Sequence, residues 1–459
     1  MELTTANLAD YEEEIPWNDL PATLKDAAVA TNLLGMRYLW IDSLCIIQDD
    51  ATDKIREIGQ MNKVYTHATL TIKARRGDKA TDGFLHPRSL PSGTSMLQYE
   101  DGRGQRGWVT LTFKSTLKSE ESTALDTRGW VMQEYVLSRR LVVFGTWSTE
   151  WSCRKERRVH SDGWIFSDFT SGNPFQRNDR WELSDVLAES AEAQLREKIN
   201  RLDAALFFSA NPTSQIYKPC ERDLIRTWYD LVTAYSARSL SVTTDRILAI
   251  SGLAEVFAPT VYRSSIRHAR QPQPDRYVAG LWESELPNSL LWQRASKIST
   301  PRPNEYPGPS WSWVAIDGAI WTEQKQDETC IEKFAIEVVL SDATAPFGAV
   351  ESATLDIEGE ALAIEWRYKR HEHWPLSADS SEWKFPKKLW DHSTSEFKLS
   401  VKLDAREDDT DWRRVFLLSF RHNECGIVLK EDIDGRYRRL GYYHCDNSFG
   451  FEKKRFTVV

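Results

Sequence analysis

The chain has 459 residues, of which 28% are charged and 41% hydrophobic, and its formal net charge is −9. This composition indicates no basic surface for nucleic acid. No run of about 18 apolar residues predicts a membrane span, and the acidic residues 12–14 do not fit a secretory signal. Six dispersed cysteines do not form a disulfide framework. We therefore expect a cytoplasmic protein without a membrane span and without a nucleic-acid partner.

The first predicted elements are a helix and a short strand. Leu20–Leu34 is amphipathic, with Pro21 suited to the first turn of a helix and Gly35 to the position just past its end. The apolar run within Arg37–Ile41 then predicts a buried strand. Polar residues follow directly from Asp42, and the carboxyl ends of buried strands are where open α/β sheets usually build their sites.

The next elements alternate between helix and strand. Asp53–Tyr65 is predicted as one helix, because Ile55, Ile58 and Met61 recur every third residue. Ala68–Ala74 alternates between apolar and polar residues, as a strand does. Helix, strand, helix and strand in short order predict an α/β fold with a parallel sheet and crossover helices.

A loop-rich excursion over residues 77–105 separates these elements from the next ones, and long loops of this kind are often functional. Two further strands, Trp108–Phe113 and Leu141–Phe144, are predicted on either side of a helix at Trp130–Leu137. We expect the α/β domain to occupy residues 1–150.

The rest of the chain changes character twice. Apolar residues recur at helical spacing from Trp181 to Phe257, and short alternating runs after Glu332 indicate antiparallel strands. We therefore expect a mainly helical region over residues 151–330 and a β-rich region over 331–459. The chain has 19 tryptophans, and the pair Trp311 and Trp313 has the spacing of one face of a strand. Such pairs predict either an aromatic core or a ligand-stacking surface.

Asp42 is the first candidate catalytic residue. Its place after the predicted strand would put its carboxylate near the carboxyl edge of the sheet. There it can bind a ribose hydroxyl or orient a basic side chain such as Arg128 or Arg139. The alternative is a structural role, since aspartate often caps the turn that follows it.

The segment that follows Asp42 contains four candidate ligand contacts, which are Ser43, Cys45, Gln48 and Asp49. Gln48 and Asp49 lie just before the predicted Asp53 helix, so the alternative is that an aspartate here satisfies open amides of that helix. A nucleophilic cysteine needs a nearby group that lowers its pKa. No such signature surrounds Cys45, and a small buried hydrophobic role fits it as well.

Glu57 is the second candidate catalytic residue. On a helical projection it falls at the margin of the apolar arc, where partial desolvation would raise its pKa. Such a carboxyl suits general acid/base chemistry or hydrogen bonds to sugar hydroxyls. The alternative is an ordinary ion pair with Lys54, Arg56 or Arg139.

The predicted helix at residues 130–137 contributes Trp130, Gln133 and Glu134 as candidate ligand contacts, and Arg139 follows it. Neighbouring residues on a helix point in different directions, so at most one of Gln133 and Glu134 faces the core. Either side chain would extend a site around Asp42.

Several classes of site are not predicted. His422 and Cys425, with the adjacent His444 and Cys445, lack the paired spacing of a zinc site. No segment matches a P-loop or a dinucleotide-binding fingerprint. A kinase, an NTPase and a classical dehydrogenase are therefore disfavoured, and we expect neither a metal nor a bound cofactor.

Three segments carry a family resemblance. Tyr38–Asp49 reads YLWIDSLCIIQD, Leu125–Arg140 contains Arg-Gly-Trp followed by Gln-Glu and Leu-Ser-x-Arg, and Glu57–Ala68 lies between them in order. With these motifs the chain resembles the fungal heterokaryon-incompatibility (HET) family. Further matches extend over roughly residues 20–320, ending at Pro309–Trp313.

The resemblance implies intracellular non-self recognition that leads to programmed cell death in a filamentous fungus, with other incompatibility or signalling proteins as partners and possible self-association. It also implies a fold related to the Toll/interleukin-receptor-type (TIR) domain of innate immunity. In NAD-cleaving members of that class a helical glutamate carries the activity, and the segment Asp53–Ile58 resembles its helix. NAD is then a possible substrate, and an NAD(P)-cleaving hydrolase is the alternative function.

HET domains typically begin with a strand that reads roughly Ser-Tyr-x-Trp-Gly. Residues 6–17 hold no such strand. We therefore expect a domain that lacks its first strand, either naturally or through the gene prediction. A degenerate paralogue without activity is the third interpretation.

Overall fold

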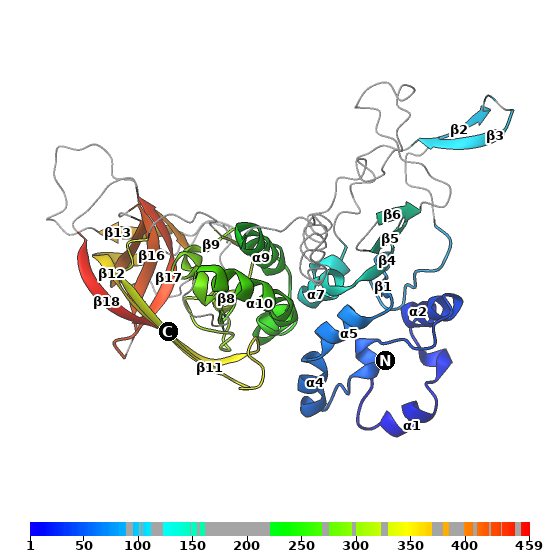
Figure 1. The fold of residues 1–459 in the computed structure, drawn as a ribbon, viewed down its shortest axis with the longest axis horizontal. Helices are drawn as coiled ribbons and strands as arrows, with labels where there is room; N and C mark the ends of the chain where they lie inside the picture. The colour runs from blue at the N-terminus through cyan, green and yellow to red at the C-terminus, as the bar shows by residue number, and fades with distance from the viewer. Residues whose placement is uncertain are drawn as a thin grey trace. The chain divides into compact units, whose positions relative to one another are not determined.

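The computed structural model divides the chain into two compact units, Met1–Asn211 and Pro212–Val459. It describes residues 1–88, 95–100, 102, 104–111, 123–146, 148–153, 157–160, 221–268, 275–295, 300–322, 329–369, 380–384, 399–406, 411–421, 424–432, 434–445 and 451–459. The first unit is a mixed α/β structure, and the second combines helices with a β-rich C-terminal part (Figure 1). The expected boundaries at residues 150 and 330 stay a prediction.

The helices described in the first unit are short. They are α1 (Leu8–Glu13), η1 (Trp17–Asp19), α2 (Ala22–Leu33), α3 (Asp42–Cys45), α4 (Ala51–Ile58), α5 (Met61–His67), η3 (Leu125–Thr127) and α7 (Gly129–Leu137). The helix predicted around residues 20–34 is confirmed as α2, with Pro21 at its N-cap. Gly35 follows it with a φ of 72°, a left-handed conformation that glycine adopts without steric cost.

A four-stranded sheet in the first unit contains a parallel pair of strands. Its order is β1 (Thr71–Lys73), β4 (Arg140–Phe144), β5 (Thr149–Cys153) and β6 (Arg157–His160). β1 and β4 run parallel with Thr71 opposite Leu141, while β5 and β6 add antiparallel neighbours. The helix α7 lies in the connection between the parallel strands, as a crossover requires. The predicted α/β arrangement is thus present in a small, partly parallel sheet.

The predicted strand at Arg37–Ile41 is wrong. Residues 36–41 are described and belong to no helix or strand, and the side chains of Tyr38 and Leu39 are 84% and 37% exposed. A short apolar run specifies an extended chain but does not supply a neighbouring strand to pair with. Asp42 therefore lies at the start of the four-residue helix α3 and not at the end of a parallel strand.

The single helix predicted at Asp53–Tyr65 is also wrong, because it is split into α4 and α5. Gly59 follows α4 and Gln60 precedes α5, and glycine weakens a helix interior. The apolar spacing predicted the wrong buried face for α4, since Ile55 is 69% exposed. The buried position of α4 is instead Asp53, whose Oδ2 accepts the Ile47 N–H at 2.9 Å.

Helices and short segments open the described part of the second unit. They are α9 (Glu221–Ser236), η5 (Thr243–Arg246), α10 (Leu248–His268), β7 (Tyr277–Val278), β8 (Leu281–Trp282), η6 (Glu283–Glu285), η7 (Asn288–Leu291), β9 (Gln293–Arg294), η8 (Trp313–Ala315) and β10 (Ile320–Trp321). Trp228 on α9 packs against Phe257 of α10 and Trp282 of β8, with ring centroids 5.6 Å apart in both pairs. The part of the predicted helical stretch at residues 181–220 lies outside the described residues.

The β-rich C-terminal part is confirmed. Its strands are β11 (Lys333–Leu340), β12 (Val350–Lys369), β13 (Ser380–Lys384), β14 (Leu399–Leu403), β15 (Arg413–Arg421), β16 (Cys425–Glu431), β17 (Tyr437–Cys445) and β18 (Glu452–Val458). They form one eight-stranded sheet, antiparallel except where β17 meets β18. The 20-residue strand β12 pairs with four others, which are β11, β13, β15 and β18.

Trp311 and Trp313 belong to the aromatic core of the second unit. Both are fully buried, and Trp313 begins η8 and so is not on a strand. The Trp313 indole N–H donates to the Gly280 carbonyl at 3.0 Å. The core interpretation therefore holds for this pair, and the ligand-stacking interpretation does not.

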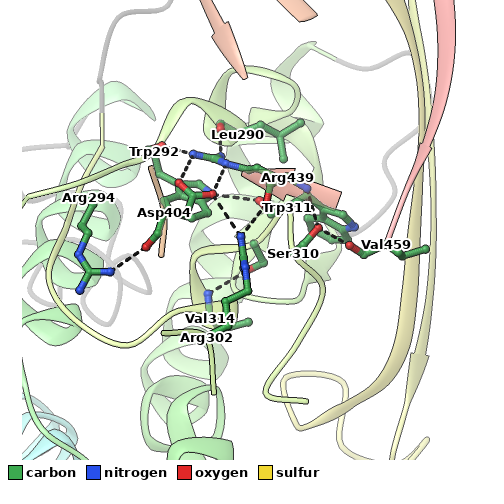
Figure 2. Close-up of polar contacts among 11 residues, drawn as sticks. Leu290, Trp292, Arg294, Arg302, Ser310, Trp311, Val314, Asp404, Arg439 and Val459 are labelled. Carbon is green, nitrogen blue, oxygen red and sulfur yellow. Dashed lines mark hydrogen bonds and ion pairs between the residues drawn. The ribbon is translucent and has the colours of Figure 1, made fainter. Parts of the chain in front are cut away.

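A buried ion pair lies beside Trp292, whose indole N–H donates to the Trp311 carbonyl at 2.9 Å. Arg439 of β17 and Asp404 are both fully buried, with Nε and Oδ2 2.9 Å apart (Figure 2). The Arg439 guanidinium stacks over Trp292 and donates to the carbonyls of Leu290 and Trp292. Because Leu290 lies in η7 and Trp292 directly after it, this one side chain joins that segment to β17.

We expect Asp404→Asn to lower the free energy of unfolding of the second unit by about 3–5 kcal/mol, because it leaves the Arg439 charge buried without its counterion. The control is Asp434→Asn, whose partner Arg436 is 3.0 Å away in an exposed pair. That change should cost under about 1 kcal/mol. Urea denaturation followed by tryptophan fluorescence measures both, and equal losses would contradict the role of the buried pair.

Candidate functional site

The segment that follows residue 41 folds back on itself through polar contacts. Asp42 is exposed, and its Oδ1 accepts the backbone N–H of Ser43 at 2.8 Å. The Gln48 amide donates to the carbonyls of Asp42 and Ile46 at 3.2 and 3.0 Å. Gln48 therefore stabilises the turn. Asp42 contacts its neighbour Ser43 within α3, and this contact is not a helix cap.

The first residues of the chain bind this segment. The Leu3 N–H donates to the Ser43 carbonyl, and the Gln48 N–H donates to the Leu3 carbonyl, each at 2.8 Å. Thr5 donates its N–H and its hydroxyl to the two Asp49 carboxylate oxygens, each at 2.7 Å. These bonds lower the pKa of Asp49. Asp49 thus has protein partners, and Asp50 is the aspartate that caps α4.

Among the carboxyl groups that the structure describes in this unit, Glu134 on α7 has the most altered environment. Burial raises its pKa to about 7, and the nearby charge of Asp42 acts in the same direction. A hydrogen bond from the Tyr65 hydroxyl and the positive charges of Arg128 and Lys73 oppose this shift. The structure therefore brings together Asp42, Tyr65, Arg128 and Glu134, which we call the Glu134 cluster.

The other candidate residues of this segment, Trp130, Gln133 and Arg139, are wholly or partly buried. Gln133 is 2% exposed, so it is the core-facing member of the Gln133–Glu134 pair, as expected. Trp130, a candidate ligand contact from the sequence, is half-buried. Arg139 follows the helix and is partly buried.

Cys45 lies near enough to the carboxylates of Asp42 and Glu57 to feel their charges. The Glu57 side chain is 25% exposed, and its Oε1 lies 3.1 Å from Arg56 Nε, which is the ion-pair alternative. Cys45 is exposed, so the expectation of a buried cysteine is wrong. Partial desolvation raises the pKa of its thiol, and the charges of Asp42 and Glu57 add to the effect. A raised pKa disfavours the thiolate, which argues against a nucleophilic role.

A buried ion cluster anchors the start of α7. Asp126 Oδ1 lies 2.5 Å from Lys73 Nζ, and its Oδ2 lies 3.0 Å from Arg75 Nε. Asp126 is buried, and the two cations hold its pKa at about 2 despite that burial. Lys73 also lies over the Tyr135 ring, 4.6 Å from its centroid. Asp126 thereby ties β1 to the beginning of α7 and fixes the position of Glu134.

The chemistry available to the Glu134 cluster is proton transfer. A carboxyl whose pKa is about 7 exchanges its proton at neutral pH, and Tyr65 holds the ionised form by a hydrogen bond. Within the described residues, no group of three or more His, Cys, Asp and Glu side chains could hold a metal ion. Asp42 and Glu134 were predicted from the sequence, whereas Tyr65 appeared there only as the last residue of a predicted helix. The Asp126 ion cluster was not predicted, since no spacing rule joins Lys73 to Asp126.

Asp126→Asn should remove about 2 kcal/mol of stability at pH 7, from a folded pKa of about 2 and an ordinary value of 3.8. Because the folded pKa is the lower one, this contribution is present above about pH 4 and lost as pH falls through 2. Hydrogen exchange of residues 129–137 at pH 7 and pH 3 measures it. Equal exchange in the parent and the variant at pH 7 would contradict the anchoring role.

Glu134→Gln should change the pH dependence of stability in the opposite direction to Asp126→Asn. The folded pKa of about 7 exceeds the ordinary 4.5, so the parent loses stability as pH rises from about 4.5 through 7. The loss is on the order of 2 kcal/mol after allowance for solvent at the partly exposed side chain. The variant should lack this slope in urea titrations between pH 5 and 8. A variant less stable than its parent at pH 8 would refute this assignment.

Comparison with known proteins adds one finding. The sequence model of the heterokaryon incompatibility protein (HET) family matches residues 2–134. No curated protein and no solved structure matches the chain. The matched segment contains Asp42, Glu57, Tyr65, Asp126 and Glu134. Residues 2–134 of this chain are therefore a HET domain, and the Glu134 cluster lies within it.

Proposed function

We propose that this protein acts in non-self recognition in a filamentous fungus, and that its HET domain triggers programmed cell death when incompatible strains fuse. The HET match over residues 2–134 carries the proposal, because it points to a role in heterokaryon incompatibility. We expect the protein to act in the cytoplasm with other incompatibility or signalling proteins. No helix among the described residues has the length and apolarity needed to cross a membrane.

Cleavage of NAD or a related nucleotide is the second candidate function, through a TIR-like domain. The observation that favours it is the Glu134 carboxyl, whose pKa of about 7 suits a general acid/base. In this proposal Asp42 binds a ribose hydroxyl and Arg128 contacts phosphate. Glu134 replaces Glu57 as the acid/base, because Glu57 is paired with Arg56. NAD would be a substrate here and not a bound cofactor.

The proposal is tested by expressing the full chain in a fungal host. We expect growth to be impaired, and Glu134→Gln and Asp42→Asn to restore it at least tenfold in colony counts, because each removes one charge from the cluster with little change of volume. The matched controls are Glu13→Gln and Asp19→Asn, which change exposed carboxylates outside the cluster. These controls should remain as toxic as the parent at equal protein levels.

Cellular NAD separates the two candidates. The enzyme proposal requires NAD to fall with the parent chain and to recover with Glu134→Gln. If Glu57→Gln abolishes the fall in NAD and Glu134→Gln does not, then Glu57 is the acid/base. Toxicity with constant NAD favours signalling by association. Normal growth of cells that express the parent chain would reject both candidates and leave the degenerate paralogue.

A further inference from the structure

Residues 2–5, which we call the strap, run alongside the segment from Ser43 to Asp49 and are bonded to both of its ends. Leu3 makes two of these bonds with its backbone. Its N–H donates to the Ser43 carbonyl, and its carbonyl accepts the Gln48 N–H, each at 2.8 Å. The Leu3 side chain is 8% exposed, so burial of an apolar group holds this backbone contact in place. A single residue thus joins the two ends of one turn.

The strap has a second attachment, at Asp49. The Thr5 N–H and hydroxyl donate to the two carboxylate oxygens of Asp49, each at 2.7 Å. Two bonds to a charged acceptor are stronger than bonds between neutral groups. Thr4, which lies between the two attachments, donates its N–H to Asn7 Oδ1 at 2.8 Å, and this bond is local. The strap therefore holds the segment through its third and fifth residues.

The segment cannot satisfy all of its own backbone groups. α3 is only four residues long, and a helix leaves the carbonyls of its last turn without partners inside the helix. The Ser43 carbonyl is one of these groups, and the strap supplies its donor. A second outside contact comes from α4, where Asp53 accepts the Ile47 N–H at 2.9 Å. The position of Asp42, at the start of α3, thus depends on contacts from outside the segment.

The position of Asp42 matters to Glu134 through charge. The groups that act on Glu134 are Asp42 of α3, Tyr65 of α5, Lys73 of β1 and Arg128 at the N-cap of α7. The Asp42 carboxylate favours the protonated form of Glu134, whereas the other three favour the ionised form. A charge acts in this way only while it stays close to its neighbour. An element that fixes Asp42 therefore also controls the proton on Glu134.

We propose that the strap positions Asp42 beside Glu134, with Leu3 and Thr5 as positioning residues. Their bonds fix both ends of the turn that begins at Asp42. The Gln48 amide carries this constraint to Asp42, because it donates to the Asp42 carbonyl at 3.2 Å. The chemical importance of the arrangement rests on the proposed function, in which Asp42 and Glu134 act on one substrate.

Urea titrations of the purified full chain from pH 5 to 8 test the proposal. The strap variant combines Leu3→Ala with Thr5→Val, which removes the apolar anchor and the hydroxyl bond. We expect its loss of stability with rising pH to be smaller than that of the parent, with a midpoint at lower pH, because Asp42 no longer raises the pKa of Glu134. Thr5→Val alone should give a smaller change in the same direction.

Thr4→Val is the matched control, since it makes the same isosteric change at the residue between the two attachments. It should keep the pH dependence of the parent. The Asp49 carboxylate does not confuse the measurement, because its pKa lies below its ordinary value and so below pH 5. A strap with a purely structural role would lower stability equally at every pH, and that result overturns the proposal.

A double-mutant cycle with Asp42→Asn shows whether the strap acts through Asp42. In the Asp42→Asn background the charge is already absent, so the strap variant should leave the pH dependence unchanged. An equal effect of the strap variant in both backgrounds would mean that Asp42 is not the intermediary, and it also overturns the proposal.

Hydrogen exchange locates the change in the chain. The amides of residues 44–48 should exchange at least about tenfold faster in the strap variant than in the parent, and at the parental rate in Thr4→Val. Unchanged exchange in the strap variant contradicts the proposal, because the strap then does not hold the segment. These measurements need no substrate, so a harmless parent chain in the growth test would reject the proposed function and leave them unaffected.

Discussion

The ionised Asp126 carboxylate is the contact on which the geometry of the HET domain depends. It joins Lys73 and Arg75, at the end of β1 and just after it, to the turn that begins α7. A parallel strand pair needs its crossover helix held against the sheet, and β1 is only three residues long. The ion pairs of Asp126 therefore hold α7 against the sheet, a role that a longer ladder of backbone hydrogen bonds between β1 and β4 would otherwise fill. Glu134, two turns farther along the chain, takes its position from this anchor.

Two carboxyl groups eight residues apart consequently have opposite properties. Asp126 meets two cations and remains ionised, while Glu134 meets another carboxylate and keeps its proton up to neutral pH. Burial raises the pKa of both carboxyl groups, and at Asp126 the two neighbouring cations outweigh it, whereas at Glu134 they do not. Opposed environments of this kind are how one fold separates a structural acid from a chemically active one.

The sequence predicted those parts of the fold that depend on local pattern. The helix at Ala22–Leu33, the strand pair β1 and β4, and the antiparallel sheet after residue 332 follow from periodicity and turn residues. It failed at Arg37–Ile41 and at Cys45, because pairing and burial depend on segments distant in the chain. For the site, motif residues such as Asp42 and Glu134 were found. Tyr65 and Asp126 were missed, since their roles arise from contacts across 60 to 70 residues and about 50 residues, respectively.

The distribution of tryptophans has a consequence for spectroscopy. The fully buried indoles at Trp228, Trp282, Trp292, Trp311, Trp313 and Trp366 all belong to the second unit. In the HET domain, Trp40 and Trp130 are half-buried and Trp108 is 60% exposed. Indoles in a dry core emit at shorter wavelength than those in water, so the tryptophans that the structure describes in the two units contribute to different parts of the emission band. The blue edge of the fluorescence spectrum therefore reports the second unit, and the HET domain must be followed at the red edge.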